Sequence, residues 1–227
     1  MTSPAPLAYE TCYHIFNHGN NRENIFVQER NYAHFLKLYA RYIDPVAETF
    51  AFCLLKNHFH LLARIRAEEE IIKISKTLKV SFPTNTDVKR RDPRDQHKSQ
   101  TKKPLGSDYP SNGFSDFFNA YAKAINAAYG RTGSLFQHPF GRVMVTNERQ
   151  FWNVVAYIHQ NPQKHKFADD FREWRWSSYG IMLSDKPTHL QRNAVLEWFG
   201  GKEQYLERHA QMVSEADSKW FVEEDED

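Results

Sequence analysis

Two strand-length segments, residues 49–55 and 58–65, are separated by only two residues, and this spacing leaves little choice about how they pair. A two-residue connection joins neighbouring antiparallel strands, so the two segments predict a β-hairpin. An earlier segment, residues 11–18, also reads as a strand and is followed by a turn sequence at residues 19–21. We therefore expect an antiparallel sheet.

Apolar residues at helical spacing predict the helices that accompany this sheet. The pattern covers residues 29–43 and 114–129, and a shorter charged helix is expected at residues 68–79. A further helix is expected to begin after Asn147, a favourable N-cap, and to be limited by Pro162. Strands and helices in this order indicate an α+β fold, an antiparallel sheet with helices packed on one face.

The 227 residues carry a formal net charge of only +2, but that charge is unevenly distributed. Residues 71–103 contain ten Lys and Arg against three Asp, whereas residues 213–227 contain seven acidic residues and one Lys. A basic segment suits a protein that neutralises phosphates, and it equally suits a solvated loop. The acidic end is expected to be a disordered tail.

Other features narrow the cellular setting. No segment approaches the roughly 18 apolar residues of a membrane helix, and the first ten residues lack a secretory signal pattern. Cys12 and Cys53 are too few and too isolated for a disulfide framework or a zinc motif. These observations predict a cytoplasmic protein with reduced cysteines and no membrane association.

The sequence His58-Phe59-His60 on the second hairpin strand is the first candidate for chemistry. Alternation along a strand places both histidines on one face, where two imidazoles about 7 Å apart can converge on one divalent ion. The alternative is a pair of surface histidines, which an isolated pattern of this kind leaves open.

Tyr157 and Asn161 form the second candidate, because residues four apart lie on the same face of a helix. Placed opposite the histidines, Asn161 could supply a neutral oxygen ligand and Tyr157 a hydroxyl beside a metal-bound phosphate. The alternative is an ordinary half-buried tyrosine with an asparagine near the helix end.

Four sequence segments, followed by WRWSSY, carry a family resemblance. In chain order they are YHIFNHGNNRENIF from Tyr13, AFCLLKNHFHLLARI from Ala51, GSLFQHPFGRVMV from Gly133 and YIHQNPQKH from Tyr157. This order resembles the IS200-like tyrosine transposases of the HUH superfamily, and most closely the REP-associated tyrosine transposases. Members of this group cleave and rejoin single-stranded DNA.

The resemblance implies a ferredoxin-like, or RRM-like, sheet with the tyrosine helix packed across the face that carries the histidines. It implies that His58, His60 and Asn161 bind a divalent metal, Mg²⁺ or Mn²⁺, and that Tyr157 is the nucleophile. Cleavage at or near a hairpin would then leave a 5′-phosphotyrosine link and a free 3′-OH. Residues in or beside the shared segments that are candidates for contact with single-stranded or hairpin DNA are Arg22, Arg131, Arg142 and Lys164.

The resemblance also divides the chain. Residues 1–10 are expected to be disordered, residues 11–180 to form the catalytic domain with a charged insertion at about 66–112, and residues 181–212 to form a helical extension before the acidic tail at 213–227. His18 departs from the family pattern, since relatives usually carry Arg there.

Two other functions remain open from the sequence. A domesticated relative would bind hairpin DNA without transposition, and a metal-dependent nuclease would use water while Tyr157 served only the structure. Relatives include monomers and swapped dimers, so the chain is expected to act as a monomer or homodimer.

Overall fold

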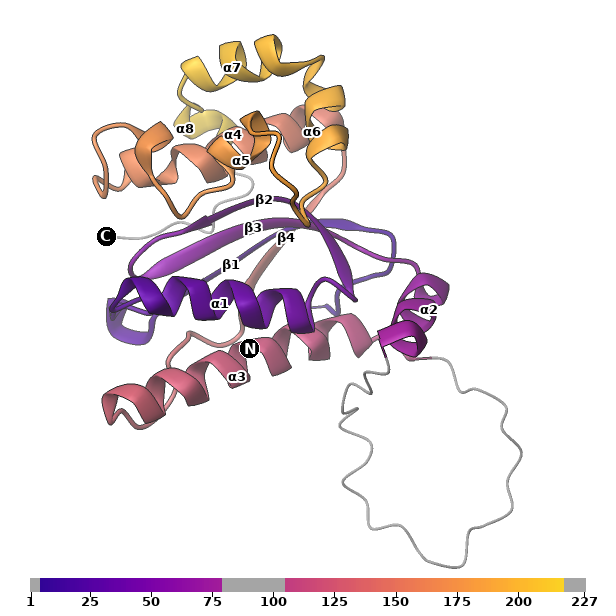
Figure 1. The fold of residues 1–227 in the computed structure, drawn as a ribbon, viewed down its shortest axis with the longest axis vertical. Coiled ribbons are helices and arrows are strands. Elements are labelled where there is room, and N and C mark those ends of the chain that lie inside the picture. The colour runs from indigo at the N-terminus through magenta and orange to yellow at the C-terminus, as the bar shows by residue number, and fades with distance from the viewer. Residues whose placement is uncertain (1–4, 79–104, 219–227) are drawn as a thin grey trace, which may run out of the picture.

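The computed structural model describes residues 5–78 and 105–218, and its centre is a four-stranded antiparallel sheet (Figure 1). The strand order is β2-β3-β1-β4. The hairpin of β2 and β3 is present, and β3 has the bounds that the sequence predicted. The strands are β1 (Cys12–His18), β2 (Ala47–Leu54), β3 (His58–Ile65) and β4 (Gly141–Val145).

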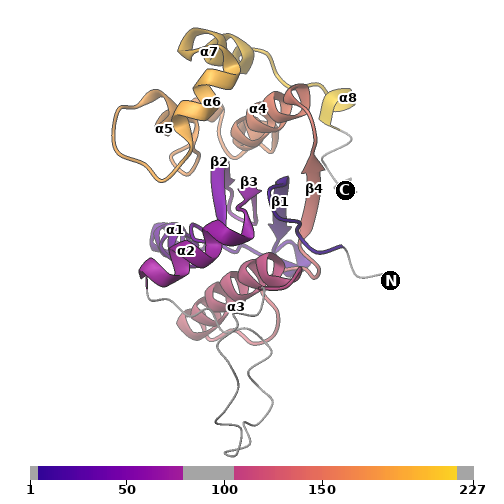
Figure 2. The same cartoon turned by 90° about the vertical axis from the view of Figure 1, so that its right-hand side faces the viewer.

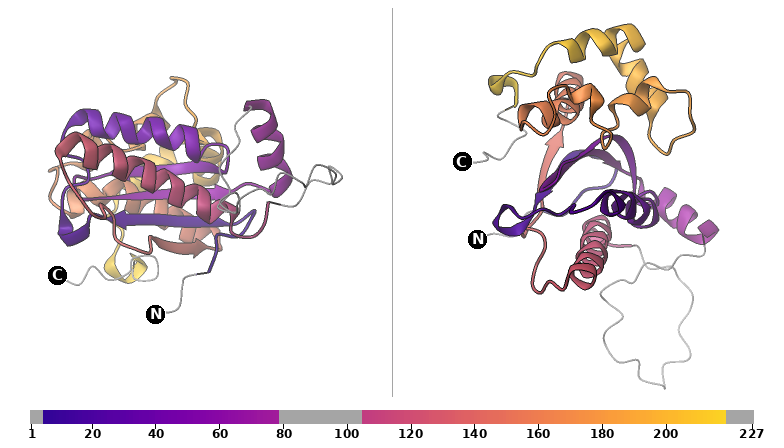
Figure 3. Two further views of the ribbon diagram at one scale, coloured as in Figure 1. Left: turned by 90° about the horizontal axis from the view of Figure 1, so that it is seen from below. Right: turned by 60° about the vertical axis from the view of Figure 1, so that its left-hand side comes forward.

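One face of the sheet is covered by α1 (Glu29–Tyr42) and α3 (Tyr109–Tyr129), which lie side by side across it (Figure 3). Aromatic side chains fill the space between these helices and the sheet. The ring of Phe35 on α1 lies 4.7 Å from the ring of Phe117 on α3 and 5.2 Å from that of Phe59 on β3. This burial provides the hydrophobic contribution that holds the two helices to the sheet.

The opposite face carries α4 (Glu148–Lys164), which packs against β2 and β3 (Figure 2). The sheet is therefore covered on both faces, which explains why seven of the eight residues of β3 are buried. Four short α-helices follow α4 in the described residues: α5 (Tyr179–Leu183), α6 (Arg192–Phe199), α7 (Lys202–Ala210) and α8 (Glu215–Ser218). Helices α6 and α7 lie within the helical extension expected at residues 181–212.

Helix α4 continues past Pro162, the residue that was expected to limit it. A proline removes one helical hydrogen bond and crowds the preceding turn, but here only two helical residues follow it. Residues after the helix satisfy carbonyl groups of its last turn. His165 N–H donates to the Asn161 carbonyl at 2.9 Å, and Phe167 N–H donates to the Pro162 carbonyl at 2.8 Å.

Two other boundaries differ from expectation. Helix α3 begins five residues before Phe114, because Pro110 occupies the first helical turn, where its missing N–H is not needed. Residues 135–145 read as extended chain in the sequence, but only Gly141–Val145 forms a strand, paired with β1, while Phe136 makes an isolated bridge to Gly19. The charged segment expected at 68–79 forms α2 (Glu68–Leu78).

The N-terminal and charged segments are described in part. Leu7 is fully buried and its N–H donates to Ser111 Oγ of α3 at 2.8 Å, so the described part of residues 1–10 is packed against the domain. The flexible loop expected in the basic insertion lies mostly outside the described residues, as do residues 219–227 of the acidic tail. No helix within the described ranges is long and apolar enough to span a membrane.

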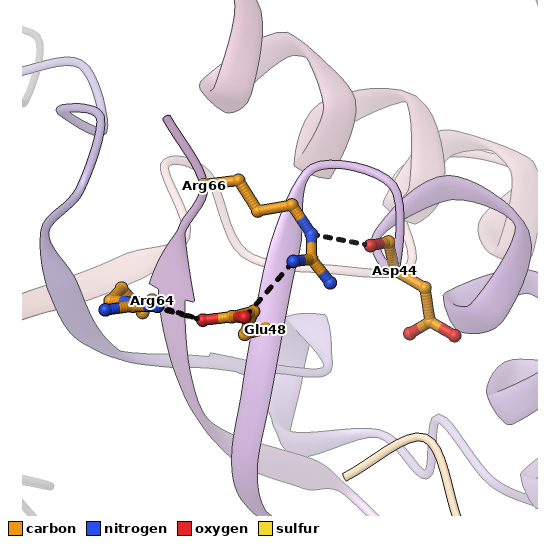
Figure 4. A network of polar contacts seen from close by, with 4 residues as sticks. All are labelled: Asp44, Glu48, Arg64 and Arg66. Atoms are coloured by element: carbon orange, nitrogen blue, oxygen red, sulfur yellow. Dashed lines mark hydrogen bonds and ion pairs between the residues drawn. The ribbon is translucent and has the colours of Figure 1, made fainter. Parts of the chain in front are cut away.

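An ion-pair network fastens the far end of the hairpin (Figure 4). Glu48 on β2 accepts from Arg64 Nε at 2.9 Å and from an Arg66 guanidinium nitrogen at 3.2 Å. Arg66 Nε also donates to the backbone carbonyl of Asp44 at 3.2 Å. These two arginines are engaged in holding β2 to β3.

Candidate active site

The two histidines of β3 face α4. His58 and His60 are each about 2% exposed, and their rings stand nearly perpendicular with centroids 5.1 Å apart. Strand alternation sends Phe59 and Leu61 to the other face, into the aromatic core under α1 and α3. The pleat of one strand therefore separates the polar residues of the site from the core.

Tyr157 and Asn161 project from α4 toward these histidines. The Tyr157 ring is edge-on to the His60 ring, with centroids 5.5 Å apart and an interplanar angle of 80°. Asn161 is fully buried, and its Nδ2 donates to the Tyr157 carbonyl at 3.0 Å. The helix is started by Asn147, whose side chain accepts from Gln150 N–H. The structure thus brings together the four residues singled out from the sequence.

Three buried atoms in this cluster lack hydrogen-bond partners among the described residues. They are Nε2 of His58, Nε2 of His60 and Oδ1 of Asn161. The other ring nitrogens are engaged: His58 Nδ1 lies 2.8 Å from Asn57 Oδ1, and His60 Nδ1 lies 3.1 Å from His14 Nε2. A buried polar atom left without a partner is destabilising, so three together indicate a ligand.

Burial controls the charge of both histidines. It lowers the pKa of His58 and of His60 well below the usual value, and the neighbouring imidazoles lower both pKa values further. Asn161 has a smaller opposite effect on the pKa of His58. Both imidazoles are therefore neutral near pH 7, which is the protonation state of a metal ligand.

The donor set fits a divalent ion. Within residues 5–78 and 105–218, no three residues drawn from His, Cys, Asp and Glu are grouped so as to hold a metal together. The third atom that could bind an ion is instead the amide oxygen of Asn161, beside the two imidazole nitrogens. The amide oxygen suits Mg²⁺ and Mn²⁺, and the two imidazole nitrogens would also accept Zn²⁺ or Ni²⁺.

Three further histidines, none of them predicted as a site residue from the sequence, surround the pair. The His18 ring stacks on His58 with centroids 4.8 Å apart, and the His165 ring meets His58 edge-on at 4.9 Å. The third, His14, contacts His60. Their spacing in the sequence could have identified them. His14, Phe16 and His18 are two residues apart and so share one face of β1, and His165 follows Asn161 by four residues.

The four basic residues proposed for DNA contact lie in different places. Lys164 Nζ sits 4.9 Å from the centroid of the Tyr157 ring. Arg22 is exposed on the short helix η1 (Asn20–Arg22), next to the end of β1. Arg131 is bound by Glu23 and Asn126.

Arg142 lies on the opposite face of the sheet from the histidines. One of its guanidinium nitrogens donates to the Ala5 carbonyl at 3.3 Å and to Ser111 Oγ of α3 at 3.4 Å. The guanidinium also lies over the Phe140 ring, 3.8 Å from its centroid. The structure therefore does not bring Arg142 together with Tyr157.

The back of α4 is tied to the C-terminal helices through His159, which is fully buried. Its Nε2 is 2.7 Å from Ser178 Oγ, and its Nδ1 is 2.9 Å from Nε2 of His209. Phe52 N–H of β2 donates to the same Ser178 hydroxyl at 2.8 Å. This chain of contacts sets the rotation of α4 against the sheet, and so the direction in which Tyr157 points.

Comparison with known proteins gives a structural match. No family model and no curated protein matches the sequence. A solved structure described as a REP-associated tyrosine transposase bound to a REP hairpin is similar to this chain, with a TM-score of 0.54 at 14% identity. The match covers 82% of this chain and 88% of that chain. At this identity the likeness concerns the fold: the chain has the fold of a REP-associated tyrosine transposase, as the ordered motifs predicted.

Proposed function

We propose that this protein is a single-strand DNA endonuclease and strand transferase that cleaves at or near hairpins through a covalent link to Tyr157. The observation that carries the proposal is the set of three unpartnered donor atoms, on His58, His60 and Asn161, beside a tyrosine in a fold shared with a tyrosine transposase. That neighbour is bound to a REP hairpin, and this motivates hairpin DNA as the substrate class here.

His58, His60 and Asn161 would hold a divalent ion, Mg²⁺ or Mn²⁺, and the chemistry such an ion supplies is polarisation of a phosphate oxygen. Residues of the chain would do the rest. The Tyr157 hydroxyl oxygen forms a bond to phosphorus as the bond from phosphorus to the 3′ oxygen breaks. The phenolic proton leaves for solvent, and the departing oxygen takes up a proton to become a 3′-OH.

The products explain why no energy source is required. The phosphotyrosine retains a phosphodiester bond, so attack by another 3′-OH can reverse the step and join new strands. Lys164, with its ammonium above the Tyr157 ring, supplies positive charge next to the reacting phosphate.

The proposed site can be assembled by residues of one chain, so a monomer could be active. His60 and Tyr157 lie on β3 and α4 of the same copy, and their rings are in contact. A swapped dimer would instead take its tyrosine from a second chain.

Because Tyr157 is only 2% exposed, DNA must displace the side chains that cover it before a phosphate can reach its hydroxyl.

The test is an incubation of labelled single-stranded hairpin oligonucleotides with Mn²⁺ or Mg²⁺, followed by a denaturing gel. We expect a covalent protein–DNA adduct in the wild type and none with EDTA, with Tyr157→Phe or with His58→Ala. Cleavage without an adduct that persists in Tyr157→Phe would replace the proposal with a hydrolytic nuclease. Hairpin binding without cleavage by any preparation would indicate a domesticated DNA-binding protein.

A further inference from the structure

His58 and His60, the two candidate histidine ligands, each have Nδ1 within hydrogen-bond distance of a different neighbour. His58 Nδ1 is 2.8 Å from the side-chain oxygen of Asn57, the residue just before it. His60 Nδ1 is 3.1 Å from Nε2 of His14, which lies on the adjacent strand β1 and is fully buried. In both histidines the engaged atom is Nδ1, and the atom without a partner among the described residues is Nε2.

The contact with Asn57 determines which nitrogen of His58 carries the proton. An amide oxygen can only accept, so Nδ1 of His58 must donate. A neutral imidazole has one N–H, so Nε2 of His58 is left with a lone pair. The alternative tautomer would place two acceptors, Nδ1 of His58 and Oδ1 of Asn57, against each other.

The contact with His14 has the same effect on His60 when His14 presents an unprotonated Nε2. His60 Nδ1–H then donates to His14, and Nε2 of His60 keeps its lone pair. The reverse arrangement would leave an N–H of His60 buried without an acceptor among the described residues, which is destabilising. The rings also stack, with centroids 5.1 Å apart and planes 20° from parallel, so His14 fixes the orientation of His60 as well.

We infer that Asn57 and His14 are positioning residues that hold His58 and His60 in the Nδ1-protonated tautomer, so that both Nε2 lone pairs are available before an ion arrives. The inference deepens the proposed function and rests on its ligand assignment. Outer hydrogen bonds of this kind orient the imidazole ligands of metal sites, and their loss typically weakens metal binding 10–100-fold. Here one partner is local in sequence and the other comes from a neighbouring strand.

The decisive measurement is long-range ¹H–¹⁵N NMR of the histidine rings in ¹⁵N-labelled full-length protein kept in EDTA. His58→Ala and His60→Ala assign the two signals among the eleven histidines. We expect the Nδ1-protonated tautomer for both rings in the wild type. Asn57→Ala should remove that preference at His58 alone, and His14→Phe, which keeps a ring but no nitrogens, at His60 alone.

A second measured quantity is the affinity for Mn²⁺, obtained by calorimetry. We expect a fall of roughly 10–100-fold in Asn57→Ala and in His14→Phe. His14→Gln, which can still accept from Nδ1 of His60, should recover part of it. His34→Phe is the matched control, because His34 lies on α1, on the other face of the sheet, and this variant should leave both readings unchanged.

An Nε2-protonated tautomer at either ring of the wild type would overturn the inference. So would unchanged tautomers and unchanged Mn²⁺ affinity in both folded variants. If the expected tautomers are found but the wild type binds no divalent ion, the positioning of the rings stands and the proposed metal-dependent function fails. The two ideas can therefore fail separately.

Discussion

The amide nitrogen of Asn161 donates to the carbonyl of Tyr157 at 3.0 Å, one helical turn back, and this contact directs the side chain of Asn161. With Nδ2 engaged, Oδ1 is left buried and without a partner among the described residues. The nucleophile candidate thus orients, through its own backbone, the amide that is proposed to share a metal with the two histidines.

Asn161→Leu should separate metal binding from stability. The substitution keeps the volume but removes an unpartnered acceptor together with one hydrogen bond, so the free energy of unfolding in EDTA should change by no more than about 1 kcal/mol. The affinity for Mn²⁺ should fall at least tenfold, because one of three proposed ligands is lost. Calorimetry and urea unfolding measure the two quantities.

Asn119→Leu, at an exposed position of α3 on the other face of the sheet, is the control for this change, and it should leave Mn²⁺ affinity at the wild-type value. If Asn161→Leu binds Mn²⁺ as tightly as the wild type does, the amide is not a ligand and the donor set proposed here is wrong.

Lys164→Met should slow formation of the covalent adduct. The ammonium of Lys164 lies 4.9 Å from the centroid of the Tyr157 ring, so its charge can stabilise the negative charge that develops on the reacting phosphate. About 1 kcal/mol of such transition-state stabilisation corresponds to roughly a fivefold change in rate. If Lys164 also contacts a phosphate, the slope of log affinity against log salt should shrink by about 1. Single-turnover gels and binding titrations at several salt concentrations test both effects.

Lys186→Met removes an exposed lysine from a loop that follows α5, and neither quantity should change in that variant. A Lys164→Met protein with the wild-type rate and salt slope would show that the cation has no part in the reaction.

Local patterns were sufficient for β3, which carries the proposed metal ligands, and for α4, which carries the proposed nucleophile. The alternation of His58, Phe59 and His60 predicted which side chains share a face, because strand alternation does not depend on the rest of the fold. The i, i+4 spacing of Tyr157 and Asn161 did the same for α4. Bringing strand and helix together depended on the family resemblance.

Contacts between residues far apart in the sequence could not be predicted from local patterns. His14 and His60 are 46 positions apart, and they meet because β1 pairs with β3 in a register that places His14 opposite Leu62 and Phe16 opposite His60. Such a register is set by the whole sheet. The contact of His159 with His209 likewise depends on how the C-terminal helices dock onto α4.

Acid should weaken the docking of these C-terminal helices. Burial lowers the pKa of His209 to about 4, and burial followed by the neighbouring His209 lowers the pKa of His159 well below its usual value. Above pH 6.5 both are neutral in the folded and the unfolded chain, and their contribution to stability is fully present. As the pH falls from 6.5 toward 4 the unfolded chain binds protons that the folded chain excludes, so stability is lost.

The size of this effect follows from the shift in pKa. For His209 the whole change is about 3 kcal/mol, and one proton cannot contribute more than about 1.4 kcal/mol per pH unit. In His209→Phe the free energy of unfolding should therefore depend less steeply on pH between 6.5 and 5 than in the wild type. His138→Gln, at an exposed position, should follow the wild-type curve. Equal slopes in all three proteins would contradict the prediction.

Replacing Arg142 should distinguish the two faces of the sheet as paths for DNA. Because its guanidinium contacts Ala5, Ser111 and the Phe140 ring on the α3 face, Arg142→Met should leave adduct yield and the salt slope of hairpin binding unchanged. Arg22→Met, at the exposed end of η1 beside β1, should reduce that slope by about 1. Binding titrations at several salt concentrations compare the two variants directly. A reduced slope in Arg142→Met with none in Arg22→Met would mean that the DNA contacts the α3 face of the sheet, away from Tyr157, which would contradict the proposed site.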